Sequence, residues 1–240
     1  MPREIKGTLY YLQAHLRYSF IIFWSIMIGV LVFSLIMKVL LASEETVVSF
    51  DFSIPIYLFG AIFGYYIVKN TMPYLIKMGV TRKSLFVSVG IHILTIALLN
   101  AIIANTIYSL LRFFYGGNIQ SSILVEIEAE ETTLAFTHFA DIFMENTWLT
   151  RVVIDTSITF FLLAATLLVG LIFYRFGLIG GIGSIAAVML IFILGMTKGW
   201  LVDFFLKIYE NFSFAFFYQL FAVGILLYLL SFILIRRITV

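Results

Sequence analysis

Six long runs of apolar residues, separated by shorter polar segments, dominate the chain. They cover approximately residues 19–42, 54–72, 85–111, 152–174, 178–196 and 213–235. Each run has roughly the 20 residues that a helix needs to cross the hydrocarbon core of a bilayer. The pattern therefore predicts an all-α integral membrane protein with six transmembrane helices, which form a single transmembrane domain over residues 1–240.

The residues before the first run have an amphipathic pattern of their own. Apolar side chains recur at steps of four, three and four, at Ile5, Leu9, Leu12 and Leu16. Positions at this spacing lie on one face of a helix, so we expect an interfacial amphipathic helix over residues 1–18. Such a helix is either a simple membrane anchor or a cytoplasmic elbow that contacts a partner.

The basic residues indicate how the bundle is oriented. Six spans place both termini on one side, together with the connections after the second and fourth spans. That side holds ten of the 15 Lys and Arg residues: Arg3, Lys6, Arg17, Lys69, Lys77, Arg82, Lys83, Arg175, Arg236 and Arg237. The positive-inside rule then predicts that both termini are cytoplasmic. It also makes residues 112–151 a long extracytoplasmic loop.

Composition narrows the function classes further. Hydrophobic residues make up 62% of the chain and charged residues 12%, which leaves no room for a separate soluble catalytic domain. The sequence has no phosphate-binding loop of the Gly-x-x-x-x-Gly-Lys-Ser/Thr type, no metal-ligand spacing and no cysteine. We therefore expect no catalytic residues, no metal site and no cofactor bound by this chain itself.

Few polar side chains lie deep in the predicted spans. Asp155 and Lys38 are close to outer span ends, where we expect both to snorkel toward the interface. His92 is either a packed, hydrogen-bonded structural residue or a proton relay. Asn100 and Asn105 either bond across helices or line a substrate path.

The connection after the second run is the most specific segment of the sequence. Pro73 is suited to the first turn of a short helix, Gly79 to its left-handed end, and Thr81 to the cap of the next span, which starts with Arg82 and Lys83. The apolar side of this helix would comprise Tyr74, Leu75 and Met78, with Lys77 beside them. That shape suits a groove on a soluble partner, although a tight basic loop is the simpler alternative.

Residues 75–86 follow the pattern Leu-x-x-Met-Gly-Val-Thr-Arg-Lys-x-x-Phe. In this segment the chain resembles the permease subunits of bacterial ABC-type exporters of the small six-span kind. A second point of resemblance is the Arg-x-Gly step at residues 175–177, between the fourth and fifth runs.

The resemblance implies that the chain lies in the bacterial cytoplasmic membrane and works with a separate cytoplasmic ATPase dimer, which binds ATP and Mg. Residues 70–83 would transmit the closure of that dimer to the bundle. A second permease subunit, identical or a sister chain, would complete the complex, with membrane lipids around it and no nucleic acid.

Two further patterns carry hypotheses. Small residues at helical steps in the fifth run suggest a packing seam, within the subunit or at a dimer interface: Gly177, Gly180, Gly181, Ser184 and Ala187. The long loop contains an acidic cluster that either attracts a cationic amphipathic cargo or is simply solvated: Glu126, Glu128, Glu130 and Glu131. The loop also contains an apolar patch that predicts an interfacial or packed segment: Leu134, Phe136, Phe139, Ile142 and Phe143.

The function expected from these features is export of an amphipathic substrate, either a peptide or a lipid-like molecule. Two other classes stay open, namely a membrane scaffold or sensor that transports nothing and an ion-coupled carrier. The carrier would require an essential His92 or Asp155, because ion coupling needs an ionisable group within the membrane.

Overall fold

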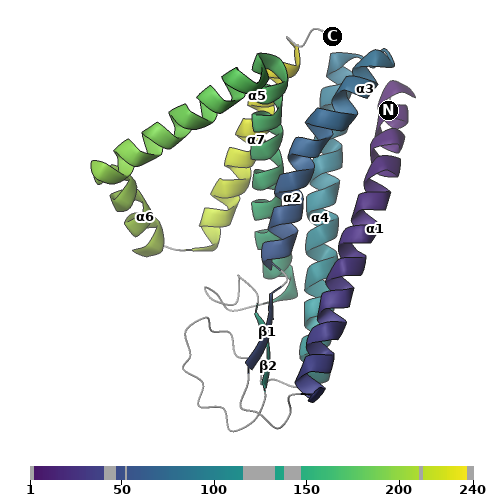
Figure 1. Cartoon of the computed structure of the whole chain (residues 1–240), viewed down its shortest axis with the longest axis vertical. Coiled ribbons are helices and arrows are strands. Elements are labelled where there is room, and N and C mark those ends of the chain that lie inside the picture. The colour runs from purple at the N-terminus through teal and green to yellow at the C-terminus, as the bar shows by residue number, and fades with distance from the viewer. Residues whose placement is uncertain are drawn as a thin grey trace.

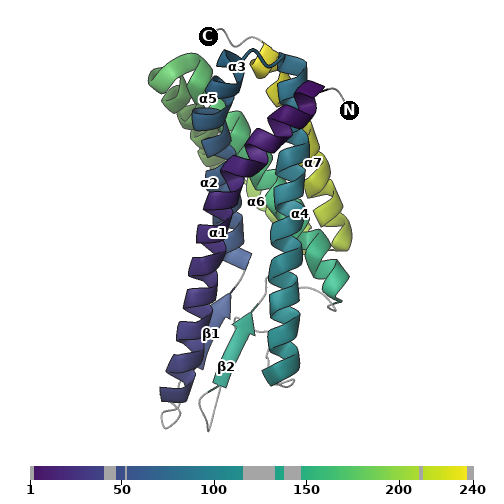
Figure 2. The same ribbon diagram turned by 90° about the vertical axis from the view of Figure 1, so that its right-hand side faces the viewer.

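The computed structural model describes residues 3–40, 47–51, 53–115, 133–137, 147–210 and 213–236. Its elements, in chain order, are α1 (Arg3–Leu40), β1 (Val47–Asp51), α2 (Ser53–Tyr66), the π-helix η1 (Ile67–Thr71), α3 (Met72–Lys77), α4 (Arg82–Tyr115), β2 (Thr133–Thr137), α5 (Trp148–Thr197), α6 (Trp200–Glu210) and α7 (Phe214–Arg236). The start of α1, the short helix α3 and the end of α7 lie at one end of an elongated helical bundle, and the two strands lie at the other (Figures 1 and 2).

Among the described residues, four helices are long and apolar enough to cross a membrane: α1, α4, α5 and α7. The prediction of a helical membrane protein is therefore confirmed at this level. The 50 residues of α5 include both the fourth and the fifth predicted spans, and the helix breaks between them at Gly177, where φ is 68° and ψ is −170°. The second predicted span corresponds to the 14-residue helix α2 and continues without interruption into η1.

The N-terminal amphipathic segment differs from its prediction. It is continuous with the first span in α1, and its apolar stripe faces protein, because Leu12 and Leu16 are buried in the main core and Ile5 is buried as well. Leu9 is half-buried. An apolar stripe at this spacing can pack either on a membrane surface or on a neighbouring helix. Here it packs on the other helices of the bundle.

Glycines bring α2 and α5 into close contact, at a place that the sequence analysis missed. Gly60 and Gly64 are one helical turn apart on α2, in the Gly-x-x-x-Gly spacing that allows two helices to approach. A Cβ atom added at Gly64 would lie 2.6 Å from the Leu163 carbonyl oxygen of α5, and one at Gly60 would lie 3.0 Å from Thr159 Cγ2. The backbones meet here because neither glycine has a side chain.

Among the described residues, the glycines of the predicted small-residue stripe of the fifth span approach only side chains of α5 itself. Beyond Gly177, α5 leans away from the other long helices (Figure 1). A Cβ atom at Gly181 would meet Phe173 of α5 itself, one at Gly180 would meet Phe176, and the Ser184 hydroxyl donates to the Gly181 carbonyl at 2.7 Å. Ala187 is exposed. Both interpretations, a seam within one subunit and a dimer interface, therefore stay predictions.

Two short strands, which the sequence analysis did not predict, lie in the connections after the first and third predicted spans. β1 pairs with β2 in parallel, from Val47 opposite Thr133 to Asp51 opposite Thr137. Leu134 and Phe136 of the predicted apolar patch belong to β2, which is a strand. The other patch residues and the four clustered glutamates lie outside the described residues.

Candidate functional site

The short helix α3 ends as its sequence predicts, but it does not begin as a separate helix. Thr71 and Met72 both have right-handed helical backbone angles, and the Met72 amide donates to the Ile67 carbonyl of η1, so α3 continues from η1 with Pro73 in its first turn. Gly79 follows the helix with φ of 82°. The Gly79 amide donates to the Ile76 carbonyl at 3.0 Å and the Val80 amide donates to the Leu75 carbonyl at 3.2 Å. This pair of bonds is a Schellman cap, which ends α3.

Leu75 is the one residue of the predicted partner-binding side of α3 that faces the bundle. Leu75 is only 2% exposed and packs into the main core, so it anchors the helix and is not available to a soluble partner. Tyr74 is 47% and Met78 63% exposed, one turn apart on the outward face. Lys77 is exposed as well. We define the outward face of α3 by Tyr74, Lys77 and Met78. This face carries two large apolar side chains and one positive charge.

The start of α4 joins the ends of two other helices. The hydroxyls of Thr81 and Ser84 lie 3.0 Å and 2.8 Å from Glu4 Oε2, in the first turn of α1. Thr81 also accepts from the Ser84 amide at 3.4 Å, as the predicted cap of α4. Arg82 Nη1 donates to the Arg236 carbonyl of α7 at 2.9 Å, whereas Lys83 is exposed. The residues after α3 therefore link α1, α4 and α7.

A column of stacked rings runs from α3 into the bundle. Tyr74 stacks on Tyr11 of α1 with ring centroids 5.1 Å apart, and Tyr11 stacks on His15 at 6.1 Å. His15 stacks on Tyr66 of α2 at 5.4 Å, and its Nε2 lies 2.7 Å from the Tyr66 hydroxyl oxygen. Phe63 continues the column 6.0 Å from Tyr66. Sequence reasoning missed this column, although Tyr11 and His15 are one helical turn apart.

A buried polar cluster joins α2, α4 and α5 near the N-terminal ends of α2 and α5. Asp155 is 0% exposed. Its Oδ1 accepts from the Tyr57 hydroxyl and its Oδ2 from Asn105 Nδ2, both at 2.7 Å. Arg151, one turn earlier on α5, is also buried and donates from Nη2 to the Ser109 hydroxyl at 3.0 Å. The prediction that Asp155 snorkels is wrong, because two donors on other helices hold it inside the bundle.

The deeper polar residues of the spans are mostly accounted for by contacts between helices. Asn105 bonds to Asp155, and the Asn100 carbonyl oxygen accepts from Trp24 Nε1 of α1 at 3.2 Å, so both asparagines bond across helices as one prediction had it. His92 is buried, with its ring 6.1 Å from that of Phe63. Its Nε2 has no hydrogen-bond partner in the part of the chain that the structure describes.

Comparison with known proteins does not place the chain in a family. It matches no protein-family model, no curated protein and no solved structure. Within the described ranges, no three His, Asp or Glu residues are grouped so that they could hold a metal ion.

Proposed function

We propose that this chain is the permease subunit of an ABC exporter in the bacterial cytoplasmic membrane. It moves an amphipathic substrate with ATP and Mg bound by a separate cytoplasmic ATPase dimer, and it pairs with a second permease subunit, identical or a sister chain. The observation that carries the proposal is α3, a short capped helix with an outward face of Tyr74, Lys77 and Met78, at the end of the bundle where α1 starts and α7 ends.

The contacts around α3 support a role in coupling. A push on its outward face would reach α1 through the stacking of Tyr74 on Tyr11, and the core through buried Leu75. Glu4 and Arg82 link the adjacent start of α4 to α1 and α7 by hydrogen bonds that involve a charged group, which are the stronger kind. These contacts give a contiguous physical route from the surface to three long helices.

Helix lengths support six spans for this permease. α2 and η1 together have 14 and 5 residues, so their 19 residues approach the roughly 20 that a span needs. The break at Gly177 divides α5 into two segments, of which the second leaves the bundle. Six spans then place both termini, α3 and most of the cations on the cytoplasmic side.

The first experiment is gentle detergent extraction of the tagged chain from its native host, followed by mass spectrometry of what copurifies. We expect a stoichiometric protein with a phosphate-binding loop, and its reproducible absence would overturn the proposal. The double variant Tyr74→Ala, Met78→Ala should lose that partner while inserting normally into the membrane. The matched control is Tyr18→Ala, Ile22→Ala, an exposed pair one turn apart on α1, which should retain it.

One observation favours a second candidate, an ion-coupled carrier. Asp155 is a fully buried carboxyl group within a candidate membrane helix, and buried carboxyl groups of this kind serve as ion or proton sites. A carrier would lose transport in Asp155→Asn and would keep it when cellular ATP is depleted. An exporter driven by ATP would show the opposite response to ATP depletion, so transport assays with and without ATP separate the two functions.

A further inference from the structure

The spacing of buried residues changes where α2 enters the π-helix η1. Within α2, one row of buried residues follows the steps of three and four that a regular helix gives: Ser53, Ile56, Gly60 and Phe63. From there through η1 into α3, the row continues at steps of four only, at Phe63, Ile67, Thr71 and Leu75. Each step of four residues advances about 40° beyond a full turn of an α-helix, so three such steps would carry the row about 120° around the helix.

The wider turn of η1 compensates for most of this drift. The Met72 amide donates to the Ile67 carbonyl, five residues earlier, whereas its α-helical partner would be the Val68 carbonyl. The one additional residue in this turn corresponds to about 100° of rotation in an α-helix. In a regular helix the next turn of the row would therefore bring Tyr74, and not Leu75, to the core. As it is, Leu75 is buried and Tyr74 is 47% exposed.

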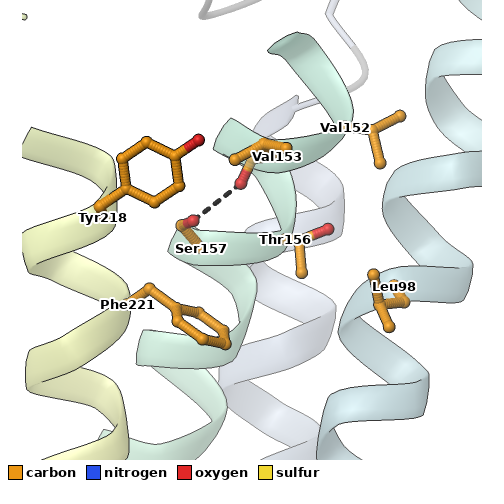
Figure 3. Close-up of a pocket in the computed structure, with 7 residues that line it drawn as sticks. All are labelled: Leu98, Val152, Val153, Thr156, Ser157, Tyr218 and Phe221. Atoms are coloured by element: carbon orange, nitrogen blue, oxygen red, sulfur yellow. Dashed lines mark hydrogen bonds between the residues drawn. The ribbon is translucent and has the colours of Figure 1, made fainter. Parts of the chain in front are cut away.

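Pro73 gives the physical reason for the wide turn. In an α-helix the carbonyl four residues back lies next to each residue, as in α5, where the Ser157 hydroxyl donates to the Val153 carbonyl at 2.8 Å (Figure 3). A proline ring clashes with that carbonyl, and proline has no N–H group to bond to it. At Pro73 the carbonyl concerned is that of Lys69, which belongs to η1. Widening the turn moves this carbonyl away from the ring.

We propose that Pro73 is the positioning residue of the outward face of α3. By imposing η1, it rotates α3 by about 100°, so that Tyr74, Lys77 and Met78 point outward while Leu75 packs into the core. The same rotation brings Tyr74 onto Tyr11 of α1. The orientation of α3 is a property of this chain alone, and its consequence for coupling rests on the exporter function proposed above, in which the outward face binds the ATPase.

Cysteine labelling measures the orientation directly, because the chain has no cysteine of its own. In the purified full-length chain, Tyr74→Cys should react with a maleimide faster than Leu75→Cys. Adding Pro73→Ala should let η1 become a regular helix and reverse the order of the two rates. The matched control is Pro55→Ala, in the first turn of α2, where the carbonyl four residues earlier belongs to β1, and it should keep the original order. An unchanged order in Pro73→Ala would overturn the proposal.

A compensating deletion separates rotation from misfolding. Removing Asn70, an exposed residue of η1, takes out the additional residue of the wide turn. In the Pro73→Ala background this deletion should restore the original order of labelling rates, since the shortened segment then reaches the same orientation as a regular helix. A second lesion in a misfolded chain would not restore it. Failure of the deletion to restore the order would overturn the one-residue rotation.

Copurification of the ATPase tests the consequence for coupling. Pro73→Ala should lose the ATPase, and the additional deletion of Asn70 should recover it, because the outward face is first turned away and then returned. Retention of the ATPase by a Pro73→Ala chain with reversed labelling would overturn the positioning role. If the original chain copurifies no ATPase, the exporter function fails, while the labelling rates still decide whether Pro73 orients α3.

Discussion

The close approach of α2 and α5 at Gly64 gives a prediction with a calculable magnitude. In Gly64→Ala, the new Cβ atom would lie 2.2 Å from Thr166 Oγ1 and 2.6 Å from the Leu163 carbonyl oxygen. The Thr166 hydroxyl belongs to a side chain and can rotate, but the carbonyl belongs to the backbone of α5. Ordinary contact begins at 3.4 Å, so restoring it at the Leu163 carbonyl requires the two helices to separate locally by about 0.8 Å.

Overpacking of this kind costs about 1–3 kcal/mol of folding free energy. Alanine also forms helices better than glycine by up to about 1 kcal/mol, which works in the opposite direction. The control Gly29→Ala, on α1, gains the same helix propensity, and its Cβ atom meets nothing within 4 Å. The difference between the two variants therefore isolates the contact, and Gly64→Ala should be less stable than Gly29→Ala by about 1–3 kcal/mol.

Thermal unfolding of the purified variants in one detergent measures this difference. A chain of this size shifts its Tm by roughly 2–4 °C for each kcal/mol, so the two transitions should be clearly separated. Gly60→Ala should fall between them, because its closest contact is the Thr159 methyl group at 3.0 Å and no backbone atom lies within 3.4 Å. Equal stability of Gly64→Ala and Gly29→Ala would refute the close approach of the two helices.

Two further predictions concern contacts that join the helices, and a third concerns the topology of the chain. Arg82→Gln should destabilise the bundle by about 1–2 kcal/mol in thermal unfolding, since it removes a charged donor to α7, whereas Lys83→Gln at an exposed position should be neutral. Asp155→Leu should cost about 2–4 kcal/mol in the same assay, because it removes the buried carboxylate that accepts from the Tyr57 hydroxyl and from Asn105 Nδ2. The chain has no cysteine, so single variants Lys77→Cys and Lys198→Cys should react with impermeant maleimides from opposite sides of the membrane, and labelling of both from one side would contradict the six-span topology.

The features around α3 were predictable because each arises from neighbours in sequence. Gly79 adopts a positive φ without steric cost, and Thr81 caps the amide three residues later. The partners of these residues were not predictable. Nothing near Thr81 in the sequence indicates that Glu4, in the first turn of α1, accepts a hydrogen bond from its hydroxyl.

For the small residues too, the sequence predicts the local feature but not its packing partner. Gly60 and Gly64 pack against α5, while the glycines of the more conspicuous stripe that begins at Gly177 approach no other long helix within the described part of the chain. Spacing shows that a face is small enough for close approach, and only the arrangement of the helices decides which small face has a neighbour. Asp155 was misjudged for a related reason, since its distance from a span end is visible in the sequence but its two donors are not.

The sequence by itself determined that this protein is helical and apolar enough for a membrane, where α5 breaks, and how α3 ends. These properties depend on hydropathy over a window of residues and on backbone preferences of single residues, both of which are local. The tertiary structure alone decided that the N-terminal stripe covers the bundle and that Asp155 is enclosed by donors from two other helices. Each of these depends on a contact between helices far apart in the chain, and hydrophobic attraction, being non-directional, does not specify such contacts from the pattern alone.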